Sequence, residues 1–280
     1  MAMLARSMTH GFAMEGAPHV SDEAVQRQHP RQPSTQPVPL GCVLNFLQNH
    51  DQIGNRAFGD RLAQTLPPEP LHLAAAMLLL NPAVPMLFMG EEHGATTPFL
   101  YFADWQGELR QAVSEGRRRE FARFRAFSDP QARRLIPDPC DPSTFTRSKL
   151  DWAAFDSDEA RRWQAYWQSL ITLRREQIQP WLTALASAGH RSSVHGRVLT
   201  VEWLFTAMGE QAARMLRMDV NLGDAAQDVS LPTADAGAQP LFQVGELTPR
   251  ADRDGTVQAT ARPVVSLGPW SGCWQWQPAI

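Results

Sequence analysis

The pattern that most restricts the fold of this chain is a pair of short apolar runs with a helical segment between them. The runs span residues 43–47 and 85–89, and each ends in polar residues or glycine. Three prolines within 67–70 introduce an apolar helix expected at about 71–80, and an Asn-Pro pair ends it. Nearly continuous apolar strands separated by a helix are typical of a parallel α/β arrangement. The first half of the chain is therefore predicted to be α/β.

The second half of the chain has a different pattern. After Pro180, residues 199–205 and 216–222 alternate apolar and polar side chains. Alternation with a period of two, with Gly, Asp and Pro between the runs, indicates antiparallel strands. The sequence thus predicts two domains, a parallel α/β domain over 1–180 and a small antiparallel β-sandwich over 181–280.

Composition narrows the class of protein. The 280 residues are 43% hydrophobic and 20% charged, as in ordinary soluble globular proteins. A formal net charge of -3 gives no electrostatic reason to expect nucleic acid or a membrane surface as a partner. The apolar stretch 71–89 is interrupted by prolines and does not predict a membrane span. Three scattered cysteines fit the reducing cytoplasm better than a disulfide framework or a zinc site.

Other segments have clear local patterns. A long loop is expected over 13–40, which is rich in Pro, Gln and Ser, and helices are expected at 117–127 and 159–177. In the last helix, Trp163 and Trp167 are expected to be core residues because apolar side chains recur there at helical spacing. Three tryptophans near the carboxyl terminus fit either a carbohydrate-binding surface or the core of the sandwich; they are Trp270, Trp274 and Trp276.

The polar residues that follow the first apolar run are the strongest candidate for a functional site. Residues 46–56 read Phe-Leu-Gln-Asn-His-Asp-Gln-Ile-Gly-Asn-Arg. In parallel α/β barrels the chemistry takes place at the carboxyl ends of the strands, where this segment would lie. From spacing alone, the alternative is a turn in which Asp51 caps a helix.

These residues resemble the α-amylase family of glycoside hydrolases. Residues 46–51 are similar to the family motif Phe-x-x-Asn-His-Asp at the seventh strand of a (β/α)8 barrel, and the extension to residue 56 resembles the branch of the family that releases trehalose. Residues 87–92, Leu-Phe-Met-Gly-Glu-Glu, are similar to the eighth strand and its rim, and 98–105 to the loop beyond it. The resemblance implies the last two strand–helix units of a TIM barrel, followed by a small antiparallel β-sandwich.

The resemblance also implies roles for individual residues. Asp51 would be the stabilising member of the family's three catalytic carboxylates, and would favour the positively charged transition state without bonding to the sugar. His50 would donate to a hydroxyl of the same ring, and Gly54 would allow a tight turn beside a ligand. The full set expected to bind substrate is His50, Gln52, Gly54, Asn55, Asn49 and Glu91. No metal or organic cofactor is implied.

Two further groups of residues leave alternatives open. Glu91 and Glu92 could form a catalytic pair with Asp51, but we favour a role at the barrel rim because neighbours on an extended segment point in opposite directions. Four aromatic residues could stack on glucose rings or could pack the loop against the barrel; they are Phe99, Tyr101, Phe102 and Trp105.

The activity implied by the resemblance is cleavage of the α-1,4-glucosidic bond next to the terminal trehalose of maltooligosyltrehalose. We find no counterpart of the family's nucleophilic Asp and general-acid Glu, and we expect barrel strands one to six to be absent. Three hypotheses follow. The chain is the carboxy-terminal portion of such a hydrolase and inactive alone, or it pairs with a separately encoded amino-terminal barrel portion, or it is a non-catalytic carbohydrate-binding or structural remnant.

Physical reasoning favours the first two of these hypotheses over an enzyme that acts alone. Two strands cannot close a barrel, and their edges would be unpaired and apolar. We therefore expect the isolated chain to be unstable or to aggregate.

Overall fold

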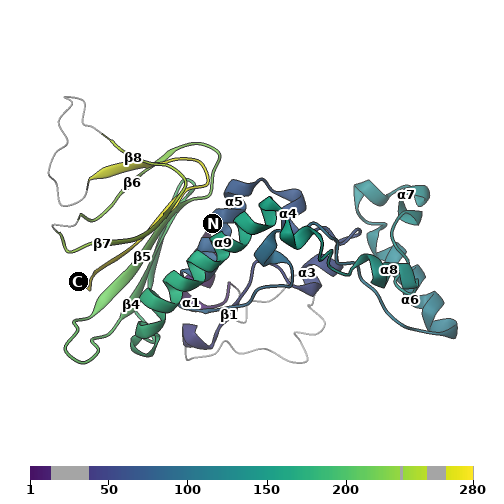
Figure 1. The fold of residues 1–280 in the computed structure, drawn as a ribbon, viewed down its shortest axis with the longest axis horizontal. Coiled ribbons are helices and arrows are strands. Elements are labelled where there is room, and N and C mark those ends of the chain that lie inside the picture. Colours follow the sequence, from purple (N-terminus) through teal and green to yellow (C-terminus); the bar gives the residue numbers. More distant parts are fainter. Residues whose placement is uncertain (14–37, 234–235, 251–262, 280) are drawn as a thin grey trace, which may run out of the picture. The chain divides into compact units, whose positions relative to one another are not determined.

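The computed structural model describes residues 1–13, 38–233, 236–250 and 263–279 (Figure 1). The chain forms two compact units, each assembled from separate parts of the sequence. The first unit comprises Met1–Asn45, His72–Pro85 and Leu170–Ile280, and the second comprises Phe46–Leu71 and Met86–Ser169. Most of the loop expected over 13–40 lies outside the described residues. The predicted domain boundary at residue 180 stays a prediction.

The first unit contains a two-stranded parallel sheet. Strand β1 (Leu44–Asn45) pairs with β2 (Val84–Pro85), and Leu44 lies opposite Val84. Helix α5 (Pro68–Leu79) lies between them in the sequence, and this strand–helix–strand order confirms the predicted partial barrel. Both strands are shorter than expected. Pro85 has no amide hydrogen to donate, which fits a ladder that ends there.

An arginine holds the turn between α5 and β2. Arg174 belongs to one turn of π-helix (Arg174–Ile178) that continues helix α9 (Asp158–Leu173). The helix expected at 159–177 is therefore confirmed, except that its last turn is a π-helix and not an α-helix. Its guanidinium donates to the main-chain carbonyl oxygens of Leu79 at 2.8 Å and Ala83 at 2.7 Å, and also contacts the carbonyl of Asn81. These carbonyls lie in the last residue of α5 or in the turn that follows it, where a helix leaves carbonyls without intrahelical donors, and Arg174 supplies the donor.

The first unit also contains two antiparallel sheets, as the alternating pattern predicts. The larger sheet has the order β3 (Arg191–His195), β4 (Val198–Phe205), β5 (Arg214–Asn221), β10 (Gly272–Pro278) and β7 (Gln239–Val244). The smaller sheet has the order β6 (Gln227–Ser230), β9 (Val264–Leu267) and β8 (Leu247–Pro249). Figure 1 shows these strands in green and yellow.

The larger sheet is covered on both faces. On one face, helix α1 (Ala2–His10) contacts β3 and β4, and the indole of Trp203 donates to the carbonyl of Met8 at 2.8 Å. On the other face, Cys273 packs in a buried cluster with Val265 of β9 and with Leu231, the residue that follows β6. The two sheets therefore share a core, as in a β-sandwich.

The tryptophans of β10 are buried on the face of the larger sheet that α1 covers, because their register places them beside Trp203 and opposite to Cys273. Trp274 and Trp276 are 1% and 4% exposed, and the ring of Trp276 meets that of Phe205 edge-on at 5.1 Å. The guanidinium of Arg214 lies over the rings of both Trp181 and Trp276, 3.6 Å from each centroid. Trp274 and Trp276 are therefore core residues and not a carbohydrate-binding surface, but their core lies on the face opposite the smaller sheet and not between the two sheets.

The second unit is built from short helices and loops. It contains the α-helices α3 (His50–Gly54), α4 (Leu62–Thr65), α6 (Gly107–Phe121), α7 (Pro130–Arg134) and α8 (Pro142–Arg147), and α9 as far as Ser169. Short 3-10 turns lie at Glu91–His93, Arg125–Phe127 and Ala154–Asp156 here, and at Leu40–Cys42 and Gln179–Ala184 in the first unit. The helix expected at 117–127 instead begins at Gly107 and ends at Phe121, because the backbone becomes extended at Phe124.

We predict that Arg174→Met lowers the free energy of unfolding by about 3 kcal/mol, since several carbonyls would lose a charged donor. Urea unfolding followed by circular dichroism measures this change. Arg175→Met is the matched control, because the neighbouring side chain is 68% exposed. Equal effects of the two substitutions would contradict a role for Arg174 in holding this turn.

Candidate functional site

The polar segment that follows β1 begins a short helix. The side-chain oxygen of Asn49 accepts from the amides of Asp51 at 2.8 Å and Gln52 at 3.3 Å. In return, the side-chain oxygen of Gln52 accepts from the amide of Asn49 at 3.0 Å. This reciprocal arrangement is a capping box. The capping residue is thus Asn49 and not Asp51, and the amide oxygens of Asn49 and Gln52 stabilise the start of α3.

Capping by Asn49 leaves the next two side chains free to face solvent. The side chains of His50 and Asp51 are 67% and 68% exposed, and the ring nitrogen Nε2 of His50 lies 3.3 Å from a carboxylate oxygen of Asp51. An imidazole and a carboxylate this close offer a donor and an acceptor to one sugar ring. The roles predicted for these two residues stay a prediction.

The end of α3 is fixed by a buried arginine of α6. Arg117 donates to the main-chain carbonyls of Gly54 at 2.6 Å and Arg56 at 2.9 Å, and only 5% of its side chain is exposed. Nothing in the sequence pattern marks Arg117 as part of the site, since its partners are main-chain atoms more than 60 residues away. Asn55 is exposed and follows directly, so its amide is free to meet a ligand.

The glycine that the backbone requires is Gly59 and not Gly54. A Cβ at Gly54 would meet only ordinary van der Waals contacts, at 4.0 Å from Phe99, and Gly54 is the last residue of a helix. Gly59 has φ +65°, and a Cβ there would lie 2.6 Å from the carbonyl oxygen of Phe99. The tight turn expected at Gly54 therefore occurs five residues later.

The segment after β2 does not continue as an extended strand. A turn at Gly90, with φ +93°, leads into the 3-10 turn Glu91–His93, so the argument from an extended backbone is wrong for Glu91 and Glu92. The two side chains nevertheless differ in surroundings. Glu91 as a residue is 8% exposed, whereas the side chain of Glu92 is 40% exposed and accepts from the amide of Gly90 at 2.9 Å.

Glu91 is a buried carboxyl with few donors. It accepts from the amide of Phe88 at 2.8 Å and is hydrogen-bonded to the side chain of Gln48. Burial outweighs these bonds and the attraction of Arg61, and raises the pKa of Glu91 to about 7. A carboxyl with this pKa is partly protonated near neutrality, unlike a permanently charged rim residue.

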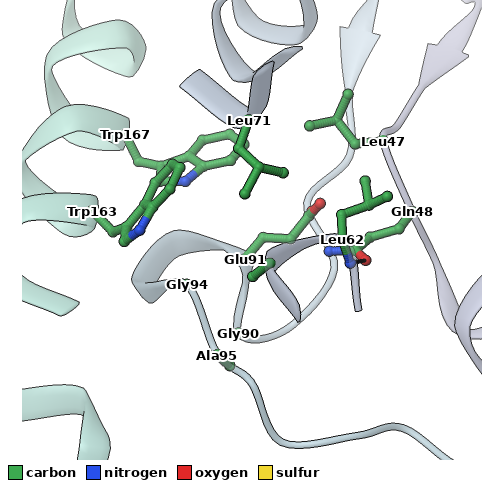
Figure 2. A pocket seen from close by; sticks show the side chains of 11 residues that line it. Leu47, Gln48, Leu62, Leu71, Gly90, Glu91, Gly94, Ala95, Trp163 and Trp167 are labelled. Atoms are coloured by element: carbon green, nitrogen blue, oxygen red, sulfur yellow. Dashed lines mark hydrogen bonds between the residues drawn. The ribbon is translucent and has the colours of Figure 1, made fainter. Parts of the chain in front are cut away.

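The small cavity beside Glu91 is mostly apolar (Figure 2). Its lining includes Leu47, Leu62, Trp163 and Trp167. A volume of about 30 Å³ holds one or two water molecules, whereas sites for small organic ligands occupy about 300–1,000 Å³. The cavity is therefore too small for a sugar ring. Trp167 is 3% exposed, which confirms its predicted core position.

Arg61 links the two loops that carry Asp51 and Glu91. The residue is 1% exposed and donates through Nε to the carbonyl of Thr97 at 2.5 Å and through Nη1 to that of Met89 at 2.7 Å. Its pKa is lowered by burial, and the nearby carboxylates of Glu91 and Glu92 oppose this effect. Arg61 follows no recognisable motif, so the sequence alone gave no reason to select it.

The aromatic loop residues differ in how much ring surface they expose. Phe99 meets Phe102 edge-on at 5.7 Å, and Phe102 meets Phe145 at 5.2 Å, so these rings pack against one another. Tyr101, Phe102 and Trp105 are 45%, 38% and 48% exposed, and the guanidinium of Arg117 lies over the ring of Tyr101, 5.2 Å from its centroid. Stacking of these rings on a sugar stays a prediction.

The described part of the chain contains no group of three or more His, Cys, Asp or Glu side chains placed to hold a metal ion. Among the helices described, none has the length and apolar character needed to cross a membrane.

Comparison with known proteins identifies relatives for most of the chain. A malto-oligosyltrehalose trehalohydrolase from Rhizobium sp. (strain M-11) is 46% identical over 176 residues, which cover 62% of this chain and 28% of the relative. One from Deinococcus radiodurans is 41% identical over 174 residues, again 62% of this chain and 28% of the relative. The chain thus spans little more than a quarter of the length of these relatives.

Structural comparison and a family model extend the match. The crystal structure of a candidate alpha amylase from Salmonella typhimurium is 33% identical, with a TM-score of 0.76 over 99% of this chain and 41% of that one. Residues 186–274 match a family model described as "Domain of unknown function (DUF3459)". These matches confirm the predicted resemblance to α-amylase-type glycoside hydrolases and, among them, to the carboxy-terminal portion of malto-oligosyltrehalose trehalohydrolases.

The burial of Glu91 predicts a specific dependence of stability on pH. Its folded pKa of about 7 lies above the ordinary value of 4.5, so the folded state holds the proton more tightly. The resulting stabilisation is complete below pH 4.5 and is lost as the pH rises through about 7. Glu91→Gln should therefore raise the free energy of unfolding at pH 8, relative to the parent, by up to about 3 kcal/mol.

Urea unfolding at pH 5 and at pH 8 measures this effect. The variant should lose part of the pH dependence that the parent shows between these values. Glu92→Gln is the control, because it removes a neighbouring carboxylate whose side chain is 40% exposed. Identical pH profiles for the parent and Glu91→Gln would contradict a strongly raised pKa.

Proposed function

We propose that this chain supplies the transition-state-stabilising part of a glycoside hydrolase that cleaves the α-1,4-glucosidic bond next to the terminal trehalose of maltooligosyltrehalose. The observation that carries the proposal is the exposed His50–Asp51 pair at the start of α3, in a segment that resembles the family motif. Identities of 41–46% to the two trehalohydrolases described above support the choice of substrate.

Asp51 acts in this proposal by electrostatics and hydrogen bonding. Its carboxylate faces solvent, so it can accept from hydroxyls of the sugar ring at the cleavage point. Positive charge develops on that ring in the transition state of glycoside hydrolysis, and a fixed negative charge stabilises it more than the ground state. His50 donates to the same ring, while Asn55 offers an amide nearby.

The other expected substrate ligands take more limited roles. The side-chain oxygens of Asn49 and Gln52 accept from main-chain amides, so these residues bind substrate through their amide NH2 groups. Gly54 contributes only main-chain atoms. The buried Glu91 would reach substrate only after a rearrangement of its loop, and its placement supports a role in shaping the site instead.

The nucleophile and the general acid are proposed to come from a further barrel segment, either of the same polypeptide or of a separately encoded one. A retaining glycosidase needs two carboxyl groups about 5 Å apart. Of the carboxylates beside this site, Glu91 is buried and Glu92 is bound to the amide of Gly90, so neither is placed to attack a sugar. We place the assembled enzyme in the cytoplasm, in line with its scattered cysteines.

The proposal predicts no trehalose release from maltooligosyltrehalose by the 280-residue chain alone. Addition of the remaining amino-terminal barrel portion from a trehalohydrolase relative should restore release. In that complex, Asp51→Asn should lower kcat/KM by roughly a thousandfold, because removal of one electrostatic stabiliser typically costs 10²–10³ in rate. Chromatographic detection of trehalose measures the product.

Asp158→Asn serves as the control for loss of a carboxylate, because the side chain of Asp158 on α9 is 90% exposed and its recorded ion pair within the described residues is with Arg161. If the chain alone released trehalose, and Asp51→Asn abolished that release, the proposal that the nucleophile and the general acid come from a further barrel segment would be wrong. Binding of maltooligosaccharide with no turnover in any combination would instead favour a non-catalytic carbohydrate-binding protein, for which the exposed Tyr101 and Trp105 are the suitable platforms.

A further inference from the structure

A second and larger cavity lies in the first unit, on the sandwich. It is formed on the face that β3, β4, β5 and β10 share, next to the edge strand β3. Its volume is about 360 Å³. The polar side chains around it come from all four strands: Arg191, Ser193, Thr200, Glu202, Arg217 and Gln277. The register explains this gathering, since Glu202 lies opposite both Arg191 and Arg217.

The floor of this cavity is a tightly bonded network. Arg217 donates to both carboxylate oxygens of Asp219, at 2.7 and 2.8 Å, and to Oε1 of Glu202 at 3.1 Å. Gln277 also donates to Oε1 of Glu202, at 3.0 Å. Arg217 and Gln277 are 9% and 8% exposed, and Asp219 is fully buried. The side chains that form the cavity floor are therefore held in place before any ligand arrives.

The network leaves one acceptor unused. Both donors to Glu202 reach the same oxygen, and among the described residues the structure records no donor to its Oε2. The hydroxyls of Ser192 and Ser193 on the exposed strand β3 likewise have no recorded partner in that part of the chain. A fixed carboxylate oxygen beside hydroxyls can accept from, and donate to, hydroxyl groups of a ligand.

Charge and size restrict the class of ligand. The two arginines of the cavity, Arg191 and Arg217, are balanced by the carboxylates of Glu202 and Asp219, so the site as a whole is neutral and favours a neutral molecule. Its volume of about 360 Å³ falls within the range of about 300–1,000 Å³ for small-ligand sites, and is twelve times that of the cavity beside Glu91.

We propose that this cavity binds a neutral sugar unit, with Oε2 of Glu202 accepting from its hydroxyls and Ser193 at the rim. That the sugar belongs to an α-glucan chain rests on the proposed function, whereas the cavity and its chemistry do not. Such a site would hold a glucan on the sandwich independently of the residues around Asp51.

Methionine methyl groups provide a direct test on the full chain. Met215 lines the cavity, whereas Met218 is buried on the opposite face of the same sheet. In a sample labelled with 13C at the methionine methyls, titration with maltotriose should move the Met215 signal and leave that of Met218 unchanged. Ser193→Ile should weaken this binding at least tenfold, because the larger side chain enters the cavity. The strand itself should be preserved, because β-branched residues are favoured in strands.

His195→Ile is the matched control, since His195 is exposed on the same strand but does not line the cavity. Asp51→Asn should leave the Met215 response intact, so failure of the proposed catalytic role would not remove the sugar site. No shift of Met215 with maltotriose would overturn the inference. A shift with inorganic sulfate but not with maltotriose would overturn it too, by showing an anion site.

Discussion

Buried and half-buried arginines that donate to main-chain carbonyl groups hold the loops of this structure. Arg174 holds the turn before β2 in the first unit, and Arg61 and Arg117 hold the two loops of the candidate site in the second. Loops of this kind have carbonyls that no ladder satisfies, and leaving such a group buried and unpaired costs about 1–3 kcal/mol. A guanidinium carries five donors in a planar fork, so a single side chain can satisfy several carbonyls together.

The loops held in this way place the two carboxyl groups of the candidate site, those of Asp51 and Glu91, in different surroundings. Asn49 caps α3 and leaves Asp51 exposed as a charged group. On the neighbouring loop, Arg61 and the turn at Gly90 place Glu91 in a water-sized apolar cavity, where burial raises its pKa to about 7. A charged, accessible carboxylate is suited to stabilise a cationic transition state, and a buried carboxyl is suited to loop packing.

Much of the fold could be predicted from the sequence, because hydrophobic periodicity and prolines report local structure. The order of β1, α5 and β2 and the alternating strands β4 and β5 follow from those patterns. The contributions of Arg61, Arg117 and Arg174 could not be predicted, because their partners are main-chain atoms distant in sequence. The cavity beside Glu202 likewise depends on strand register and on which face the smaller sheet covers.

The central claim is that Asp51 stabilises positive charge on the sugar. The most direct measurement compares binding of a cationic iminosugar and of neutral maltotriose to the chain assembled with an amino-terminal barrel portion. If Asp51 acts on the transition state, Asp51→Asn should weaken iminosugar binding at least tenfold more than maltotriose binding, since transition-state-like ligands depend most on that charge. Equal losses for both ligands would show that Asp51 serves only to bind substrate, and would contradict the claim.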